Sequence, residues 1–175
     1  MKNIKKYWFN LNDFLDSLFE NKRAVQVVFL LVILINIYFK FFFLSEMHVK
    51  FDDAFSIFYS QQSLTELYAK LSQEANPPLY FTLLHFWIKL FGVGVVAVKS
   101  LSAIFSIGSA AVIFMIAKRY MNLLGVLVVS ILFVFSNLHF DFSHEVRAFS
   151  LVFFLSSLSI YLFLRVIDCS SMENK

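Results

Sequence analysis

The chain has 175 residues, of which 59% are hydrophobic and only 15% are charged. This balance excludes an ordinary water-soluble domain. The net charge of +3 is small, and Lys and Arg flank apolar runs instead of forming one basic tract, which argues against nucleic acid as a partner.

Four apolar runs predict membrane-spanning helices, because a helix needs about 20 mostly apolar residues to cross the hydrocarbon layer. These spans are expected at about 24–44, 95–117, 123–138 and 148–164. The last two are short and must use flanking residues or a thinner bilayer. The first run lacks a small-residue cleavage site, so it is interpreted as a retained anchor and not as a cleaved signal peptide. The predicted fold class is an all-α, polytopic membrane helical bundle.

The positions of Lys and Arg predict the orientation, since cytoplasmic loops are enriched in these residues. Lys22 and Arg23 precede the first span, Lys118 and Arg119 separate the second from the third, and Arg165 follows the fourth. We therefore expect a multi-pass protein of the cell (plasma) membrane with both termini in the cytoplasm. Residues 1–23 form a cytoplasmic lead, 24–165 the membrane region and 166–175 a cytoplasmic tail.

The longer outer segment, 45–94, is expected to contain interfacial helices. Ser63 and Glu66 have the spacing of a capping box, and apolar residues then recur at helical intervals. The apolar run from Leu79 to Phe91 is only about 13 residues long, which is short for a span, so we expect it to lie in the headgroup region. The alternative, in which this run crosses the membrane, would reverse all later topology.

Asp52 and Asp53 are the first candidates for chemistry. Adjacent carboxylates beside a membrane are able to act as a general base for a hydroxyl or as ligands for a divalent cation. The alternative is structural: acidic residues in the first turn of a helix that continues from Ala54 interact favourably with the helix dipole.

A second group of charges precedes the fourth span. Asp141, His144, Glu145 and Arg147 crowd into seven residues, and Lys99 lies about one turn inside the second span. Such a group is able to hold a phosphate or a cation, and mutual salt bridges are the alternative.

Five motifs occur in one order: FDDAFSIFY, NPPLYFTLLHFWIKLFG, VKSLSAIFS, KRY and FSHEVRAFSL. Together they resemble the N-terminal region of membrane glycosyltransferases of the dolichyl-phosphate-mannose protein mannosyltransferase superfamily. More narrowly, the chain is similar to glycosyltransferase family 39 proteins and the RgtA/B/C/D-like domain, which have the GT-C fold. The similarity runs from about Asp52 to Leu164.

The resemblance implies roles for individual residues. Asp52 takes the place of the catalytic base and Asp53 that of its acidic neighbour. Glu145 and Arg147 fall on the Glu and Arg of the fourth-span motif, and Lys99 falls where Arg is common. The chain departs from the family pattern at three positions, which puts the donor or acceptor preference in doubt: Asn76 replaces a frequent His, His144 a usual Gln, and Phe149 a usual Tyr.

The resemblance also implies a reaction and its partners. The donor is a sugar on a polyprenyl phosphate embedded in membrane lipid, and the acceptor is a hydroxyl on the outer face. Arg147 and Lys99, with Glu145 and His144, would surround the donor phosphate. A divalent cation, Mg²⁺ or Mn²⁺, would share that task, with Asp53 and Glu145 as candidate ligands.

The family's chains usually continue through several more spans, so we expect this chain to correspond to the front portion of such an enzyme. The competing hypothesis is a non-catalytic membrane accessory or transport subunit whose outer charges bind a partner.

Overall fold

A computed structural model of the protein describes residues 22–74 and 76–173, and within these ranges the chain forms eight helices and no strand. The helices are α2 (Lys22–Phe42), α3 (Phe51–Gln61), α4 (Leu64–Leu71), α5 (Pro78–Phe91), α6 (Val95–Tyr120), α7 (Leu123–Val134), α8 (Asn137–His144) and α9 (Phe149–Glu173). The expected all-α class is therefore confirmed. Most of the expected cytoplasmic lead lies outside the described residues.

Three helices are long and apolar enough to cross a membrane: α2, α6 and the Phe149–Cys169 part of α9. The chain is thus a multi-pass membrane protein. The sequence places the end of the last span at Leu164, but α9 continues as a helix beyond Arg165 into the expected tail.

The third expected span is not one straight helix. The helices α7 and α8 form a pair bent by 51°, which counts as a fourth span only if the pair is taken as one. Ser136 lies at the break, and its hydroxyl accepts a hydrogen bond from the His139 amide at 3.4 Å. This cap satisfies a first-turn amide of α8 and lets the chain change direction.

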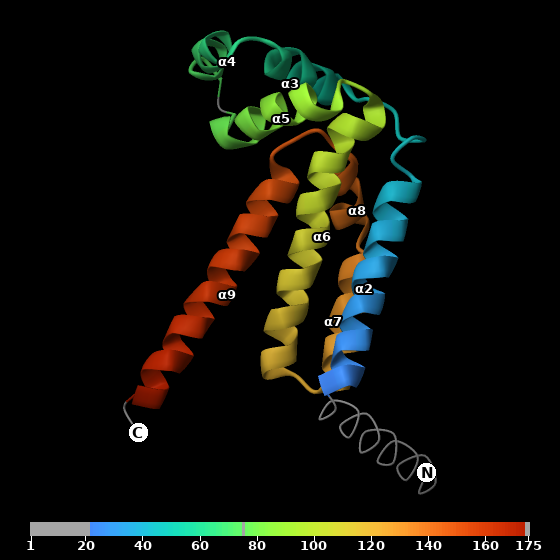
Figure 1. The fold of residues 1–175 in the computed structure, drawn as a ribbon, viewed down its shortest axis with the longest axis vertical. Helices are drawn as coiled ribbons and strands as arrows, with labels where there is room; N and C mark the ends of the chain where they lie inside the picture. Colours follow the sequence, from blue (N-terminus) through green and yellow to red (C-terminus); the bar gives the residue numbers. More distant parts are fainter. Residues whose placement is uncertain (1–21, 75, 174–175) are drawn as a thin grey trace, which may run out of the picture.

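Three helices lie across one end of the bundle. Figure 1 shows α3, α4 and α5 running transverse to the long helices, with α2 beginning and α9 ending at the opposite end. The helix α5 has 14 residues and is separated from α6 by Gly92, whose positive φ of 83° is a conformation that glycine adopts without strain. The run from Leu79 to Phe91 is not among the candidate spans.

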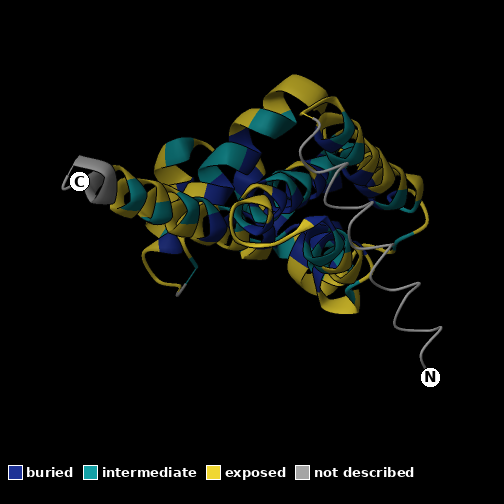
Figure 2. Cartoon of the chain, turned by 90° about the horizontal axis from the view of Figure 1, so that it is seen from below, coloured by how far each residue is buried: buried dark blue, intermediate teal, exposed yellow. Residues whose placement is uncertain are grey.

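The helix α6 is the centre of the bundle and contacts α2, α5, α7, α8 and α9. Figure 2 shows buried residues towards the middle of the molecule and exposed residues on the outer faces of the helices. Small side chains allow close approach: a Cβ added at Gly108 would lie 2.9 Å from the Phe154 ring of α9. Small residues at such crossings are typical of helices packed in lipid.

Polar side chains are also buried inside the bundle. Lys40 is fully buried, donates a hydrogen bond to the His139 carbonyl at 3.2 Å and lies 5.3 Å from the centroid of the Phe140 ring. The His139 ring lies 2.7 Å from the Ser106 hydroxyl. These contacts join α2, α8 and α6 through groups that would be costly to leave unpaired in an apolar interior.

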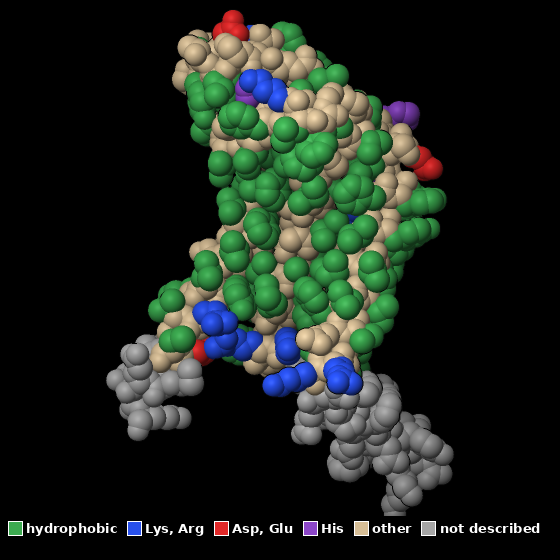
Figure 3. Space-filling view, viewed as in Figure 1, with side chains coloured by type: hydrophobic (Ala, Val, Ile, Leu, Met, Phe, Trp, Pro, Cys, Tyr) green, Lys and Arg blue, Asp and Glu red, His purple; other side chains and the backbone are tan. Residues whose placement is uncertain are grey.

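The two ends of the bundle differ in charge. We call the end with α3, α4 and α5 the transverse end, and the opposite end the basic end, because Lys and Arg side chains gather there (Figure 3). The described basic side chains of that end are Lys22, Arg23, Lys118, Arg119 and Arg165. Asp168 of α9 forms an ion pair there with Arg119 of α6.

Candidate functional site

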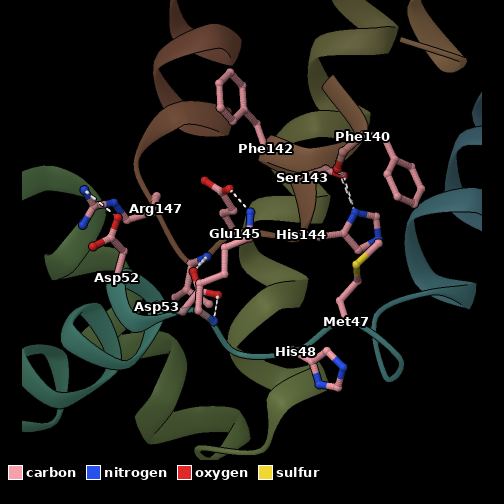
Figure 4. Close-up of polar contacts among 12 residues, drawn as sticks. Met47, His48, Asp52, Asp53, Phe140, Phe142, Ser143, His144, Glu145 and Arg147 are labelled. Carbon is pink, nitrogen blue, oxygen red and sulfur yellow. Dashed lines mark hydrogen bonds and ion pairs between the residues drawn. The ribbon is translucent and has the colours of Figure 1, made fainter. Parts of the chain in front are cut away.

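Two segments far apart in sequence meet at the transverse end. Residues 50–53 begin α3, and residues 145–147 connect α8 to α9; Figure 4 shows their charged side chains facing one another. The fold thus brings together the two groups of charged residues that the sequence singled out. Whether they act on a substrate stays a prediction.

Asp53 joins the two segments through backbone hydrogen bonds. It occupies the third position of α3, and its side chain is only 1% exposed. One carboxylate oxygen accepts from the Lys50 amide at 3.1 Å, and the other accepts from the Val146 amide at 2.6 Å. Bonds from amides to a buried carboxylate are strong, so Asp53 holds the 145–147 connection against α3.

Asp52 has a different environment although it is adjacent. Its side chain is 65% exposed, and one carboxylate oxygen lies 3.8 Å from a guanidinium nitrogen of Arg147. The Arg147 side chain is 22% exposed. The site therefore offers an accessible carboxylate beside a partly buried cation.

Lys50 belongs to the site but was not among the sequence-predicted residues. Its ammonium group lies 2.5 Å from a carboxylate oxygen of Glu145, and this hydrogen bond raises the pKa of Lys50 above its ordinary value. The signal in the sequence was its position two residues before Asp52. Nothing local indicated that its partner would be 95 residues away.

Lys99 lines the same small cavity as this ion pair, in the second turn of α6, and is 1% exposed. Its ammonium group donates to the carbonyls of Met47 at 3.0 Å and His48 at 2.9 Å. A lysine has three N–H donors, so one lacks an acceptor among the described residues. Lys99 lines a cavity of about 30 Å³, too small for a sugar. The other residues that line it are Met47, His48, Lys50, Asp141, His144 and Glu145.

His144 is held by the protein instead of facing outward. It is 3% exposed, with Nε2 at 3.0 Å from the Lys40 carbonyl and Nδ1 at 2.8 Å from the Phe140 carbonyl. The Lys40 carbonyl lies in the last turn of α2, where no amide of the same helix is available to it. His144 therefore connects the end of α2 to α8 beside the cavity.

Tyr80, in the Pro-Pro-Leu-Tyr stretch, fixes α5 against the bundle. It is fully buried, and its hydroxyl lies 2.8 Å from the Ser102 hydroxyl of α6. Burial raises the pKa of Tyr80, so this phenol stays neutral at physiological pH. Its contact sets the transverse helices relative to the charged site.

No three His, Cys, Asp or Glu side chains in the described part of the chain are grouped closely enough to hold a metal ion. Of the two candidate ligands, Asp53 accepts from two backbone amides and Glu145 pairs with Lys50. A bound divalent cation stays a prediction.

Comparison with known proteins adds no family assignment. No family model, no curated protein and no solved structure matches the chain.

Proposed function

We propose that the chain works as a membrane glycosyltransferase, or as part of one, that moves a sugar from a polyprenyl-phosphate donor to an acceptor hydroxyl. The observation that carries the proposal is the exposed Asp52 carboxylate beside Arg147, at the end of a membrane bundle. An accessible base next to a cation is the pair that this transfer needs, and the motif resemblance assigns the same two residues to it.

The proposed step uses Asp52 as the general base. Its carboxylate takes the proton of the acceptor hydroxyl while the hydroxyl oxygen attacks the anomeric carbon. The bond between that carbon and the phosphate oxygen breaks, and polyprenyl phosphate leaves with the bonding electrons. Arg147 stabilises the negative charge of the leaving phosphate. Direct displacement inverts the anomeric centre.

Lys50 and Lys99 form a second cationic position for the donor phosphate. Glu145 now pairs with Lys50, and the cavity that both line together with Lys99 has room for little more than water. A phosphate that contacts Lys99 must therefore first separate Lys50 from Glu145. In this proposal Glu145 pairs with Lys50 until the donor phosphate binds. Asp53 keeps the 145–147 connection beside α3 throughout.

The transverse end is proposed to face the outside of the plasma membrane, with the basic end in the cytoplasm. The support is the segregation of Lys and Arg at the basic end, which matches the charge bias of cytoplasmic loops. Polyprenyl-linked donors for extracellular transfer would then meet the site from the outer leaflet.

A second candidate function is a non-catalytic accessory or transport subunit. The observation that favours it is the mutual pairing of charges, Lys50 with Glu145 and Arg147 with Asp52, which neutralises these four side chains without a ligand. In that case the charged residues would stabilise the fold only. Replacing any one of them would not change the rate of sugar transfer measured in membranes.

A transfer assay separates the two candidates. Membranes that contain the full chain, or its Asp52→Asn, Arg147→Ala or Glu74→Gln variant, are supplied with a polyprenyl-phosphate sugar and acceptor. Glu74 is an exposed acid outside the site and serves as the matched control. We expect Asp52→Asn to lower the rate about 100-fold or more, as loss of a general base does. Arg147→Ala should also lower the rate, and Glu74→Gln should not; equal transfer by all four proteins would refute the catalytic roles.

A further inference from the structure

The basic end carries a groove that the proposed transfer reaction does not use. It lies between the first turns of α2 and the last turns of α6 and has a volume of about 200 Å³. The residues that line it are Val25, Gln26, Phe29, Phe114, Met115 and Lys118. Most of this lining is apolar, and Lys118 is its one cation.

The groove has an apolar floor. Val25 and Phe114 are each 3% exposed, and the rings of Phe29 and Phe114 lie 5.0 Å apart. Phe114 belongs to the cluster of buried residues between α2 and α6, and the partly buried Phe29 packs against that cluster. In a bilayer such a floor is contacted by a hydrocarbon chain.

Lys118 is the one basic residue among those that line the groove. Lys118 is exposed in the last turn of α6 and forms no ion pair with a described residue. Lys22 begins α2 about one turn before Val25 and Gln26, so it lies at the same end of the bundle. Asp168 is the one acid among the described side chains of the basic end, and it pairs with Arg119. The positive charge at the groove is therefore not neutralised by the described side chains.

We propose that this groove is a binding site for an anionic phospholipid, with an acyl chain against Phe29 and Phe114 and the phosphate at Lys118. Charge complementarity selects the occupant: a zwitterionic lipid offers the same chain but no net charge, whereas basic pockets between membrane helices favour anionic headgroups. The site holds α2 to α6 at the end opposite the transfer site. It is independent of the transfer chemistry.

The test uses the full chain in vesicles of phosphatidylcholine that contain increasing phosphatidylglycerol, with the thermal midpoint as the readout. Phosphatidylglycerol should stabilise the wild-type chain in a saturable way, because a bound ligand stabilises the folded state. Lys118→Gln should raise the phosphatidylglycerol fraction that gives half of the maximal stabilisation about five-fold. This is the factor expected for one lysine near an anionic surface. Lys89→Gln, which removes an exposed lysine from α5 at the other end, should leave it unchanged.

Two further variants distinguish a built site from diffuse attraction to a charged surface. Met115→Trp fills the groove without changing any charge and should weaken the effect, whereas Lys118→Arg should retain it. Equal curves for Lys118→Gln and Lys89→Gln, or an unchanged curve for Met115→Trp, would overturn the proposal. So would equal stabilisation by pure phosphatidylcholine, by inorganic phosphate, or by self-association of the chain at higher concentration.

Discussion

At the residue level, two adjacent carboxylates have separate roles because successive helical side chains point about 100° apart. Asp53 faces the bundle and accepts two backbone amides, whereas Asp52 faces outward beside Arg147. The sequence offered a catalytic pair or a helix start as alternatives. The start of α3 is real, and only Asp52 has the exposure that a base needs.

Replacing Asp53 should lower stability more than replacing Asp52. Asp53→Ala leaves the Lys50 and Val146 amides without their acceptor and should reduce the free energy of unfolding by about 3 to 6 kcal/mol, since hydrogen bonds to charged groups are worth roughly 1.5 to 3 kcal/mol each. Asp53→Asn keeps one acceptor oxygen and should lose about half as much. Unfolding in mixed detergent micelles measures both values.

The control is Asp52→Ala, which removes an exposed ion pair worth about 1 kcal/mol or less. If Asp52→Ala and Asp53→Ala cost the same, the separation of a structural from an accessible carboxylate is incorrect.

At the level of elements, local signals predicted the helix starts well. The spacing of Ser63 and Glu66 predicted the start of α4, and the structure has both bonds of the capping box: Ser63 Oγ accepts from the Glu66 amide, and Glu66 accepts from the Ser63 amide. The bend between α7 and α8 was missed, because hydropathy averages over the break and gives little weight to one serine.

The cap of α4 provides a pH-dependent test. Hydrogen bonds from Ser63 lower the pKa of the exposed Glu66. The contribution of Glu66 to folding stability is therefore present above the ordinary glutamate pKa of 4.5 and is lost as the pH falls through the lowered value. Ser63→Ala should cost roughly 1 kcal/mol at pH 7. The difference in thermal midpoint between wild type and Glu66→Gln should shrink as the pH falls below 4.5. Thermal midpoints across that range measure it, and a difference that grows in acid would contradict the assigned cap.

The crossing of α6 and α9 depends on Gly108. Gly108→Leu should displace Phe154, separate the two helices and lower the thermal midpoint, because the added side chain overlaps the ring. Gly108→Ala should cost less, since only the edge of a ring must shift. Adding Phe154→Ala to Gly108→Leu should restore part of the loss; a purely additive double variant would show that the two residues do not share the contact.

At the level of the whole molecule, hydropathy predicted the membrane class and three of the spans, because span length is set by the bilayer. The order of the motifs could not show that Asp53 bonds to Val146, since that contact joins positions 93 apart and depends on how the fold places the start of α3 beside the connection between α8 and α9. The ion pair of Lys50 with Glu145 was missed for the same reason, because it joins positions 95 apart. Pattern reasoning therefore found most of the charged residues but not their pairing.

In the proposed topology, the charged site and the basic end lie on opposite sides of the membrane, with the site outside. Labelling of cysteines in intact cells by an impermeant maleimide tests this directly. The native Cys169 is exposed in α9 at the basic end and should react only after permeabilisation. In a Cys169→Ser background, Thr65→Cys on the exposed face of α4 should react in intact cells. Protection of Thr65→Cys together with labelling of Cys169 in intact cells would contradict the account.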